Sequence, residues 1–391
     1  MITLDDDPLG RVYLDHNATS PARPQAVEAV RAALAAGHGN PSSVHREGRA
    51  AKAIVESSRE EVAALLGVPP GAVVFTSGGS EAIEAAIRGV ADRAPVHVRR
   101  VVMPSVEHSA VLEAVGALEA RGFLAERIPC DADGRVDVDR YLAALKRHTA
   151  LACLQWANPE TGVVQPVEEV GRACRRAGIA LLVDAVQAAG KVAMDPRTVP
   201  ADFLAVSSHK LGGPQGVGAL TVREGIALAP LIHGGAQERR RRGGTPAVAL
   251  IAGFGAAAAA ARESLRDEAA RLLRLRARLE ARLRDRFPEV RLHGQAAPRL
   301  PNTVNFSIPE VAGDLLVIAL DLAGFAVSTG SACASGAVEP SHVLLAMGCD
   351  DAEARGAVRV SLGWNTAAAD IDRFADALPA IVARLRREVV R

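Results

Sequence analysis

The sequence predicts an α/β protein, in which a mostly parallel sheet lies between helices, with a smaller α+β domain beside it. Short apolar runs alternate with helix-forming segments over about 200 residues, a pattern typical of a parallel sheet covered on both faces. After a long helix the pattern changes to shorter strands and helices. The 391 residues suffice for one large and one smaller domain. We expect a large domain at 20–260 and a small domain made of 1–19 and 261–391.

The expected elements follow from local patterns along the chain. Amphipathic spacing predicts helices, and short apolar runs that end in polar or glycine-rich turns predict strands. Leucines recur on one face of the long helix, arginines lie opposite them, and Pro288 ends it. Helices are expected at 24–36, 46–66, 256–287, 314–323 and 370–387. Strands are expected at the start of 12–21 and at 72–76, 100–103, 150–156, 179–184, 203–206, 290–293, 303–307 and 358–362.

Composition narrows the class of protein. The net charge of +1 gives no general argument for binding nucleic acid or a membrane. No apolar run reaches the length of a bilayer span, and the acidic N-terminus lacks the pattern of a signal peptide. The cysteines are odd in number and have no paired short spacing, which argues against disulfides and against a zinc site; they are Cys130, Cys153, Cys174, Cys333 and Cys349. We expect a reduced, cytoplasmic protein without a metal site.

Two charged residues follow neighbouring apolar runs. Asp184 ends the run 179–184, and Lys210 lies just after the run 203–206. Open α/β sheets bind ligands at the carboxyl ends of their strands. A Schiff-base lysine with an acid facing a pyridinium nitrogen is the signature of pyridoxal 5′-phosphate (PLP). The plainer alternatives are a surface lysine and a helix N-cap. Lysine is scarce in this chain, which has only Lys52, Lys146, Lys191 and Lys210.

The turn Thr76-Ser-Gly-Gly-Ser-Glu81 is a candidate anion site. It joins a strand to a helix start, where backbone N–H groups and the helix dipole favour negative charge. Ser80 adds a hydroxyl group. The segment lacks the Lys-Ser/Thr ending of a nucleotide-binding loop, so the phosphate of a cofactor fits better.

A small, polar, glycine-rich loop carries Cys333. The other cysteines lie in apolar runs or at helix starts, where a thiol is usually inert packing. A thiol in an exposed loop is a candidate nucleophile, and a plain small loop residue is the alternative.

Ordered motifs along nearly the whole chain carry a resemblance. The chain resembles the cysteine desulfurases of the NifS/IscS type, within the class V aminotransferases, from Tyr13 to about Ala383. This resemblance implies PLP-dependent fold type I with a seven-stranded sheet in the large domain. The matching motifs are Tyr13-Leu-Asp with Ala18-Thr19, Gly39-Asn-Pro-Ser-Ser-Val-His45, Thr76-Ser-Gly-Gly-Ser-Glu81, Glu107-His-Ser109, Asp184-Ala-Val-Gln187, Ser207-Ser-His-Lys210, His233-Gly-Gly, Gln237-Glu-Arg239, Gly244-Thr245, Ser331-Ala-Cys333 and Arg359-Val-Ser-Leu-Gly363.

The resemblance implies roles around the cofactor ring. Lys210 would form the Schiff base and move the substrate Cα proton. Asp184 would face the pyridine nitrogen, and Gln187 the phenolic oxygen. His108 would stack on the ring as an acid–base partner, with helix capping as the alternative. Asn158 would also contact the cofactor.

The resemblance also implies phosphate, substrate and partner contacts. The phosphate would be held by Gly79, Ser80, Ser207 and His209. Thr245 would reach the phosphate of the neighbouring subunit, which implies a homodimer. Arg359 would bind the carboxylate of L-cysteine. The thiolate of Cys333 would take the substrate sulfur as a persulfide, release alanine and pass the sulfur to a protein acceptor or scaffold.

Two segments depart from the family pattern and bear on substrate handling. Asn158-Pro159-Glu160 stands where relatives have Asn-Asn-Glu, and Ile83-Glu84 replaces Asp-Asn. The arginine run 239–242 is either a solvated face, a substrate entry or a surface for an acidic sulfur acceptor.

Three functions stay open from the sequence. The first is a PLP-dependent cysteine desulfurase, for which Cys333 argues. The second is another class V PLP enzyme, an aminotransferase or a selenocysteine-lyase-like enzyme. The third is a non-catalytic paralogue that binds partners in a sulfur-transfer complex, although Lys210 and Asp184 argue against a mere scaffold.

Overall fold

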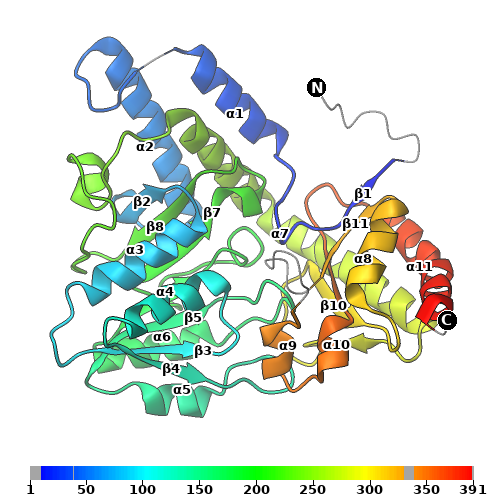
Figure 1. The fold of residues 1–391 in the computed structure, drawn as a ribbon. Coiled ribbons are helices and arrows are strands. Elements are labelled where there is room, and N and C mark those ends of the chain that lie inside the picture. Colours follow the sequence, from blue (N-terminus) through cyan, green and yellow to red (C-terminus); the bar gives the residue numbers. More distant parts are fainter. Residues whose placement is uncertain (1–9, 38, 330–338, 390–391) are drawn as a thin grey trace.

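A single long helix, α7 (Val248–Arg286), joins the two lobes of the molecule (Figure 1). The computed structural model describes residues 10–37, 39–329 and 339–389. Cys333 therefore lies outside the described residues. The lobes meet near the N-terminal strand β1 (Val12–Tyr13), which pairs in parallel with β11 (Phe325–Ala326).

The large lobe contains a seven-stranded sheet in the order β2-β8-β7-β6-β5-β3-β4. Only β8 runs antiparallel to its neighbours in this sheet. Its strands are β2 (Val73–Thr76), β3 (Arg100–Pro104), β4 (Leu124–Ile128), β5 (Thr149–Gln155), β6 (Ala180–Asp184), β7 (Phe203–Ser207) and β8 (Gly218–Val222).

Helices cover both faces of this sheet. Strand residues alternate between two hydrophobic clusters: Val73 and Phe75 point to one, and Val74 to the other. α3 (Gly79–Ala91) and α4 (Ser109–Glu119) pack on the second face. The first face is covered by α2 (Arg46–Leu66), α5 (Val138–Ala144), α6 (Val167–Ala177) and the first half of α7, with α1 (Pro24–Ala35) packed on α7.

The small lobe has a four-stranded antiparallel sheet in the order β12-β13-β10-β9. Its hydrophobic core joins Val12 and Leu14 to α7 residues from Leu272 onward. The strands are β9 (Arg291–Leu292), β10 (Thr303–Ser307), β12 (Ser328–Thr329) and β13 (Ala357–Ser361). The helices are α8 (Gly313–Leu322), α9 (His342–Ala346), α10 (Asp351–Arg355) and α11 (Ala368–Val389).

The two lobes have separate hydrophobic cores. The last α7 residue in the core of the large lobe is Ala261, and the first in the small-lobe core is Leu272. The limits of the two domains stay a prediction.

The long helix begins eight residues earlier than the sequence predicts. Gly253 and Gly255 lie within this earlier part of α7 and allow close packing. A Cβ atom on Gly255 would lie 2.7 Å from the Cα of Ser58 in α2. Among the described helices, α7 alone is long and apolar enough to cross a membrane by length and composition. Because it packs against α1 and α2 and joins both cores, we interpret it as a core helix.

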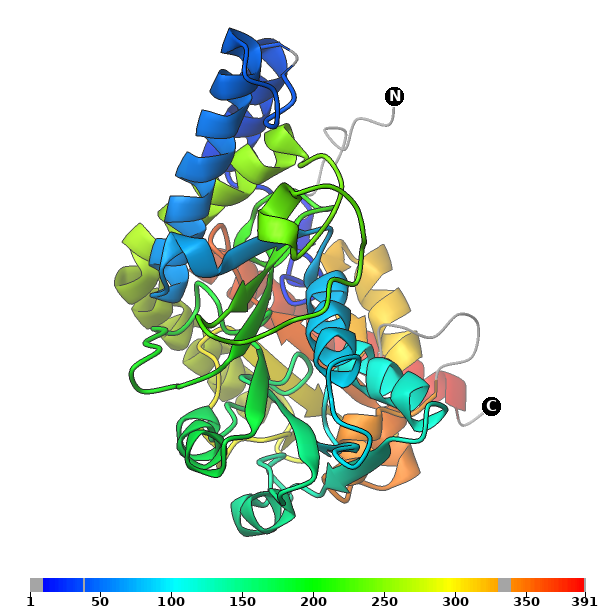
Figure 2. The ribbon, with the colours of Figure 1, turned by 90° about the vertical axis from the view of Figure 1, so that its left-hand side faces the viewer.

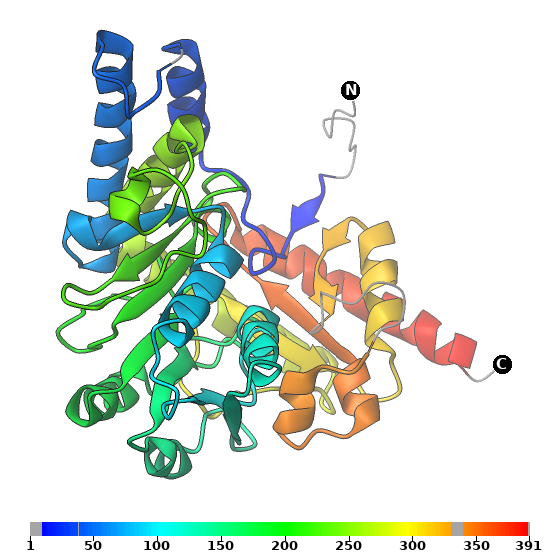
Figure 3. The ribbon, with the colours of Figure 1, turned by 60° about the vertical axis from the view of Figure 1, so that its left-hand side comes forward.

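Two strands of the large sheet, β4 and β8, are not predicted by the apolar runs of the sequence. β4 (Leu-Ala-Glu-Arg-Ile) is an edge strand that carries charges, as exposed edges commonly do. β8 follows a glycine-rich segment and is not among the expected strands. Figures 2 and 3 show α1 and α2 extending away from the rest of the large lobe.

Candidate active site

The predicted acid and lysine meet at one end of the sheet. β6 and β7 are parallel neighbours, with Asp184 opposite Ala205, and Lys210 lies in the short helix η2 (Ser208–Leu211) after β7. The Nζ atom of Lys210 donates to the carbonyl oxygens of Asn17 (2.5 Å) and Ala18 (2.7 Å). Burial raises the pKa of Asp184, and the nearby His108 and Lys210 oppose that rise.

His108 both caps a helix and faces this pair. It is the N-cap of α4, and its Nδ1 accepts the N–H of Ala110 at 3.1 Å. Burial lowers the pKa of His108, and the nearby Asp184 opposes that fall. Because Nδ1 is an acceptor, the neutral ring carries its proton on Nε2.

The N-terminus of α3 lies beside the ends of β6 and β7. A Cβ atom on Gly79 would lie 2.8 Å from Cγ2 of Val186 and 3.5 Å from Cβ of Ser207, so only glycine fits without a shift. The first-turn N–H groups of α3 therefore face the same end of the sheet as Asp184, and Ser80 is exposed there.

His209 and Thr245, two other predicted phosphate contacts, lie in different surroundings. His209 bonds the Oγ1 of Thr19 through Nδ1 (3.1 Å), and burial with nearby Lys210 and Lys191 lowers the pKa of His209 to about 4. Thr245 is exposed in the segment between η3 (Gln237–Arg240) and α7.

Gln187 bonds the polar turn that also holds Lys210. Its Nε2 donates to the carbonyl oxygen of Asn17 at 2.9 Å, and its Oε1 accepts from Lys191 Nζ at 3.1 Å. Lys191 also donates to the Gln187 carbonyl oxygen at 3.0 Å. Burial, with the charges of Lys210 and Arg359, lowers the pKa of Lys191 to about 7.

Arg359 is buried in β13 and already has partners. Its Nη2 bonds Asp15 at 2.8 Å, and its Nη1 donates to the carbonyl oxygen of Pro159 at 3.3 Å. Among the described residues its buried Nε has no partner. The guanidinium group therefore keeps donors for a carboxylate.

Asn158 supports its own loop rather than an open site. Its Oδ1 accepts from the N–H groups of Glu160 (2.9 Å) and Thr161 (3.0 Å), and its Nδ2 donates to Val106 at 3.1 Å. Its side-chain oxygen thus already accepts from the backbone of its own loop, and a direct contact of Asn158 with a cofactor stays a prediction. The neighbouring Pro159 contributes its carbonyl oxygen, which accepts from Asn17 and Arg359.

Asn17 is the main site residue that the sequence did not single out. It is buried, bonds Pro159, Thr303 and Asn302 through its side chain, and offers its carbonyl oxygen to Lys210 and Gln187. The only signal was the polar turn after the first strand, because main-chain acceptors leave no residue-type pattern.

Two buried carboxyl groups also border the site. Burial and Asp184 raise the pKa of Glu107 to about 8, and burial raises that of Glu160 to about 7. Glu107 accepts the Gln155 N–H at 2.6 Å, and Glu160 accepts from the Ser341 hydroxyl at 2.5 Å. Burial thus disfavours the charged form of both groups.

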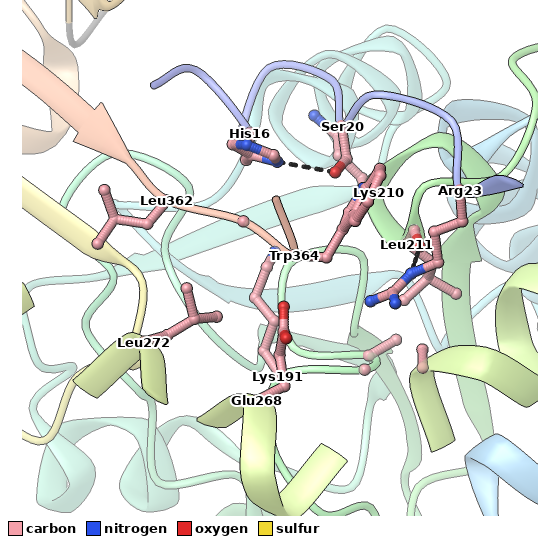
Figure 4. Close-up of a pocket in the computed structure, with 14 residues that line it drawn as sticks. His16, Ser20, Arg23, Lys191, Lys210, Leu211, Glu268, Leu272, Leu362 and Trp364 are labelled. Atoms are coloured by element: carbon pink, nitrogen blue, oxygen red, sulfur yellow. Dashed lines mark hydrogen bonds between the residues drawn. The ribbon is translucent and has the colours of Figure 1, made fainter. Parts of the chain in front are cut away.

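A small cavity of about 30 Å³ is lined in part by Lys210 (Figure 4). It is lined by polar groups that include His16, Lys191 and Glu268, and His16 bonds Ser20 at 2.8 Å. Its volume suits one or two water molecules and is far too small for a cofactor.

The arginine run 239–242 is partly anchored. Arg239 and Arg241 donate to the carbonyl oxygen of Gly71, and Arg242 pairs with Glu81 of α3 at 2.9 Å.

Ile83 is buried in the core, and Glu84 pairs with Arg88 on the helix surface. The Ile83-Glu84 departure therefore serves packing and surface charge.

Comparison with known proteins identifies the family. Residues 12–374 match the domain family described as aminotransferase class-V. The chain belongs to the class-V aminotransferase family. A cysteine desulfurase of Cereibacter sphaeroides is 45% identical over 378 residues, covering 96% of this chain and 97% of the relative.

Solved structures agree with this membership of the class-V family. A NifS-like protein has a TM-score of 0.90 at 34% identity, covering 96% of this chain and all of its own. A structure described as SspA in complex with cysteine has a TM-score of 0.80 at 32% identity, covering 90% and 98%. The predicted resemblance to NifS/IscS-type cysteine desulfurases and the predicted fold type I are confirmed.

Proposed function

We propose that this chain is a PLP-dependent cysteine desulfurase that converts L-cysteine to L-alanine and leaves the sulfur on Cys333 as a persulfide. The observation that carries this proposal is the full-length relation to cysteine desulfurases, combined with Asp184, His108 and Lys210 at one sheet end. The relative solved in complex with cysteine supports the substrate. The persulfide would go to a protein acceptor, for iron–sulfur clusters or thiolation.

The residues present fit the cofactor. The N-terminus of α3, where Gly79 leaves room, suits a phosphate, and the buried Asp184 suits a protonated ring nitrogen. Gln187, Ser207 and His209 lie on the elements around them. When bound, PLP supplies an electron sink that weakens the bonds at the substrate Cα.

The chain's own groups would then move protons and sulfur. Lys210, held by two carbonyl oxygens, is positioned to accept and return the Cα proton. Arg359 would bind the substrate carboxylate through its remaining donors. The Cys333 thiolate would attack the sulfur of the substrate and form an S–S bond as the bond between Cβ and sulfur breaks. The electron pair of the broken bond would stay on Cβ of the substrate. That carbon takes up a proton and becomes the methyl group of alanine.

We further propose a cytoplasmic homodimer. The exposed apolar residues Val27 and Leu34 on the projecting α1, with Val44, would be covered by a second copy. The exposed Thr245 would reach the partner's phosphate site. The four described cysteines are all free thiols, which fits a reducing compartment.

The deciding experiment replaces Cys333 with serine. Cys333→Ser should still bind PLP and L-cysteine but should lose nearly all alanine and sulfide production, because a serine alkoxide is scarcely populated at neutral pH. Alanine and sulfide are assayed together, and mass spectrometry of the wild type should find added sulfur on Cys333. An aminotransferase would be unaffected by the change, and sulfur on Cys130 instead would disprove the assignment.

A second experiment tests the lysine. Borohydride reduction of the PLP-loaded protein should fix the cofactor on Lys210, and Lys210→Ala should prevent this. Lys191→Ala is the matched control, because its amine lies nearby but bonds Gln187. A label on Lys191 in the wild type would overturn the assignment.

A further inference from the structure

Three metal-binding side chains meet in the small lobe. His293 follows β9, Cys349 follows α9, and Glu353 lies in α10. The Nδ1 of His293 is 3.8 Å from Sγ of Cys349 and 3.8 Å from Oε1 of Glu353. All three ligand atoms lie within 4.8 Å of one another. The cluster shares no residue with the candidate active site.

The surrounding residues orient these ligand atoms. His293 is buried at 5% exposure, and its Nε2 bonds the hydroxyl of Ser307 at 3.2 Å, which leaves Nδ1 facing the cluster. Arg291 bonds Oε2 of Glu353, which leaves Oε1 on the side of His293. A polar contact on the second nitrogen of a histidine and on the second oxygen of a carboxylate is the usual support around a metal site.

The separations leave room for one small ion, although Sγ of Cys349 and Nδ1 of His293 also form a long sulfur hydrogen bond. An N···O distance of 3.8 Å is too long for a hydrogen bond. Bond lengths of about 2.0–2.3 Å in a tetrahedral site place neighbouring ligand atoms about 3.3–3.6 Å apart. The two pairs with His293 would close around an ion by a few tenths of an ångström, and the Cys349–Glu353 pair, whose ligand atoms lie within 4.8 Å, by no more than about 1.3 Å. Thiolate, imidazole and carboxylate are the ligand types of zinc.

We propose that His293, Cys349 and Glu353 bind a zinc ion, with water as the fourth ligand. Spacing along the chain does not predict this site, because 56 residues separate His293 from Cys349. The ion would join β9 to the corner between α9 and α10. The first residue of α9, His342, donates through Nε2 to the carbonyl oxygen of Glu107 in the active-site segment (3.0 Å). Zinc would thus fix the far end of a helix whose near end contacts the candidate active site.

Cobalt titration tests the proposal on the full-length, PLP-loaded protein after chelator treatment. The wild type should bind one Co²⁺ at this site, show a thiolate-to-cobalt charge-transfer band in difference spectra, and lose the band when Zn²⁺ is added. Cys349→Ala should abolish the band. Cys130→Ala is the matched control, because Cys130 is also a half-buried thiol beside α9, and it should leave the band unchanged. Cys333→Ser should also leave the band unchanged.

A second variant tests whether a loss of cobalt binding comes from the missing ligand and not from misfolding. His293→Asn keeps a polar side chain beside Ser307 and should weaken cobalt binding by about tenfold or more. Circular dichroism would check that each variant is folded. The proposal is overturned if the wild type shows no thiolate band, if the band survives Cys349→Ala, or if Cys333→Ser removes it.

Discussion

At the scale of the residue, Lys191 has a property that the proposed chemistry does not use. Its amine is buried, and burial with two nearby cations lowers its pKa from the ordinary 10.5 to about 7. Between these pH values the unfolded chain binds one more proton at this position than the folded chain. The free energy of unfolding therefore rises with pH across this window.

We predict that Lys191→Met removes this pH dependence. The wild type should gain stability over the variant by up to about 1.4 kcal/mol per pH unit between about pH 7 and pH 10. Urea unfolding at several pH values measures the difference. Lys52→Met is the control, because Lys52 is exposed on α2. A Lys191→Met difference that does not change with pH would contradict the lowered pKa.

Residue types predicted only part of this site. Asp184 and Lys210 could be found because each follows an apolar strand, and parallel strands bring their carboxyl ends together. Asn17 and Lys191 could not, since their bonds involve carbonyl oxygens that every residue possesses. The oxygen of Asn158 has backbone partners that only the folded loop reveals.

At the scale of the element, η3 ties the arginine run to the large lobe. Glu238 and Arg239 have positive φ angles of 44° and 55°, which non-glycine residues rarely adopt. A buried ion pair holds this conformation: Arg59 of α2 bonds both carboxylate oxygens of Glu238 at 2.7 and 2.9 Å. Glu238 also accepts the N–H of Phe75 in β2 at 2.9 Å. One carboxylate thus joins η3, α2 and β2.

We predict that Glu238→Ala destabilises the protein by about 3 kcal/mol, because it leaves the Arg59 charge buried with only a partly exposed partner, Glu56. Denaturant unfolding measures the loss. The matched control is Glu84→Ala, which breaks an exposed helical pair with Arg88 and should cost about 0.5 kcal/mol or less. An equal loss of stability in the two variants would show that the buried Arg59–Glu238 pair stabilises the protein no more than the exposed pair does.

At the scale of the whole molecule, the sequence predicted two lobes but not how the chain's ends share them. The N-terminal strand β1 pairs with β11 in the small lobe, and the turn after it supplies the carbonyl oxygens that hold Lys210 in the large lobe. Pairing between residues more than 300 positions apart leaves no local pattern. The site therefore depends on both lobes, and under the proposed assembly on both subunits.

Mixed dimers test the composite site. Each proposed site joins Lys210 of one subunit to Thr245 of the other. Lys210→Ala and Thr245→Ala homodimers should each be poorly active. A heterodimer of the two variants places both defects in one site and leaves the other site with native residues. Co-expressed variants with different affinity tags should therefore regain L-cysteine desulfurase activity when the heterodimer is purified. If Thr245 acted within its own subunit, each site would keep one defect and activity would not return.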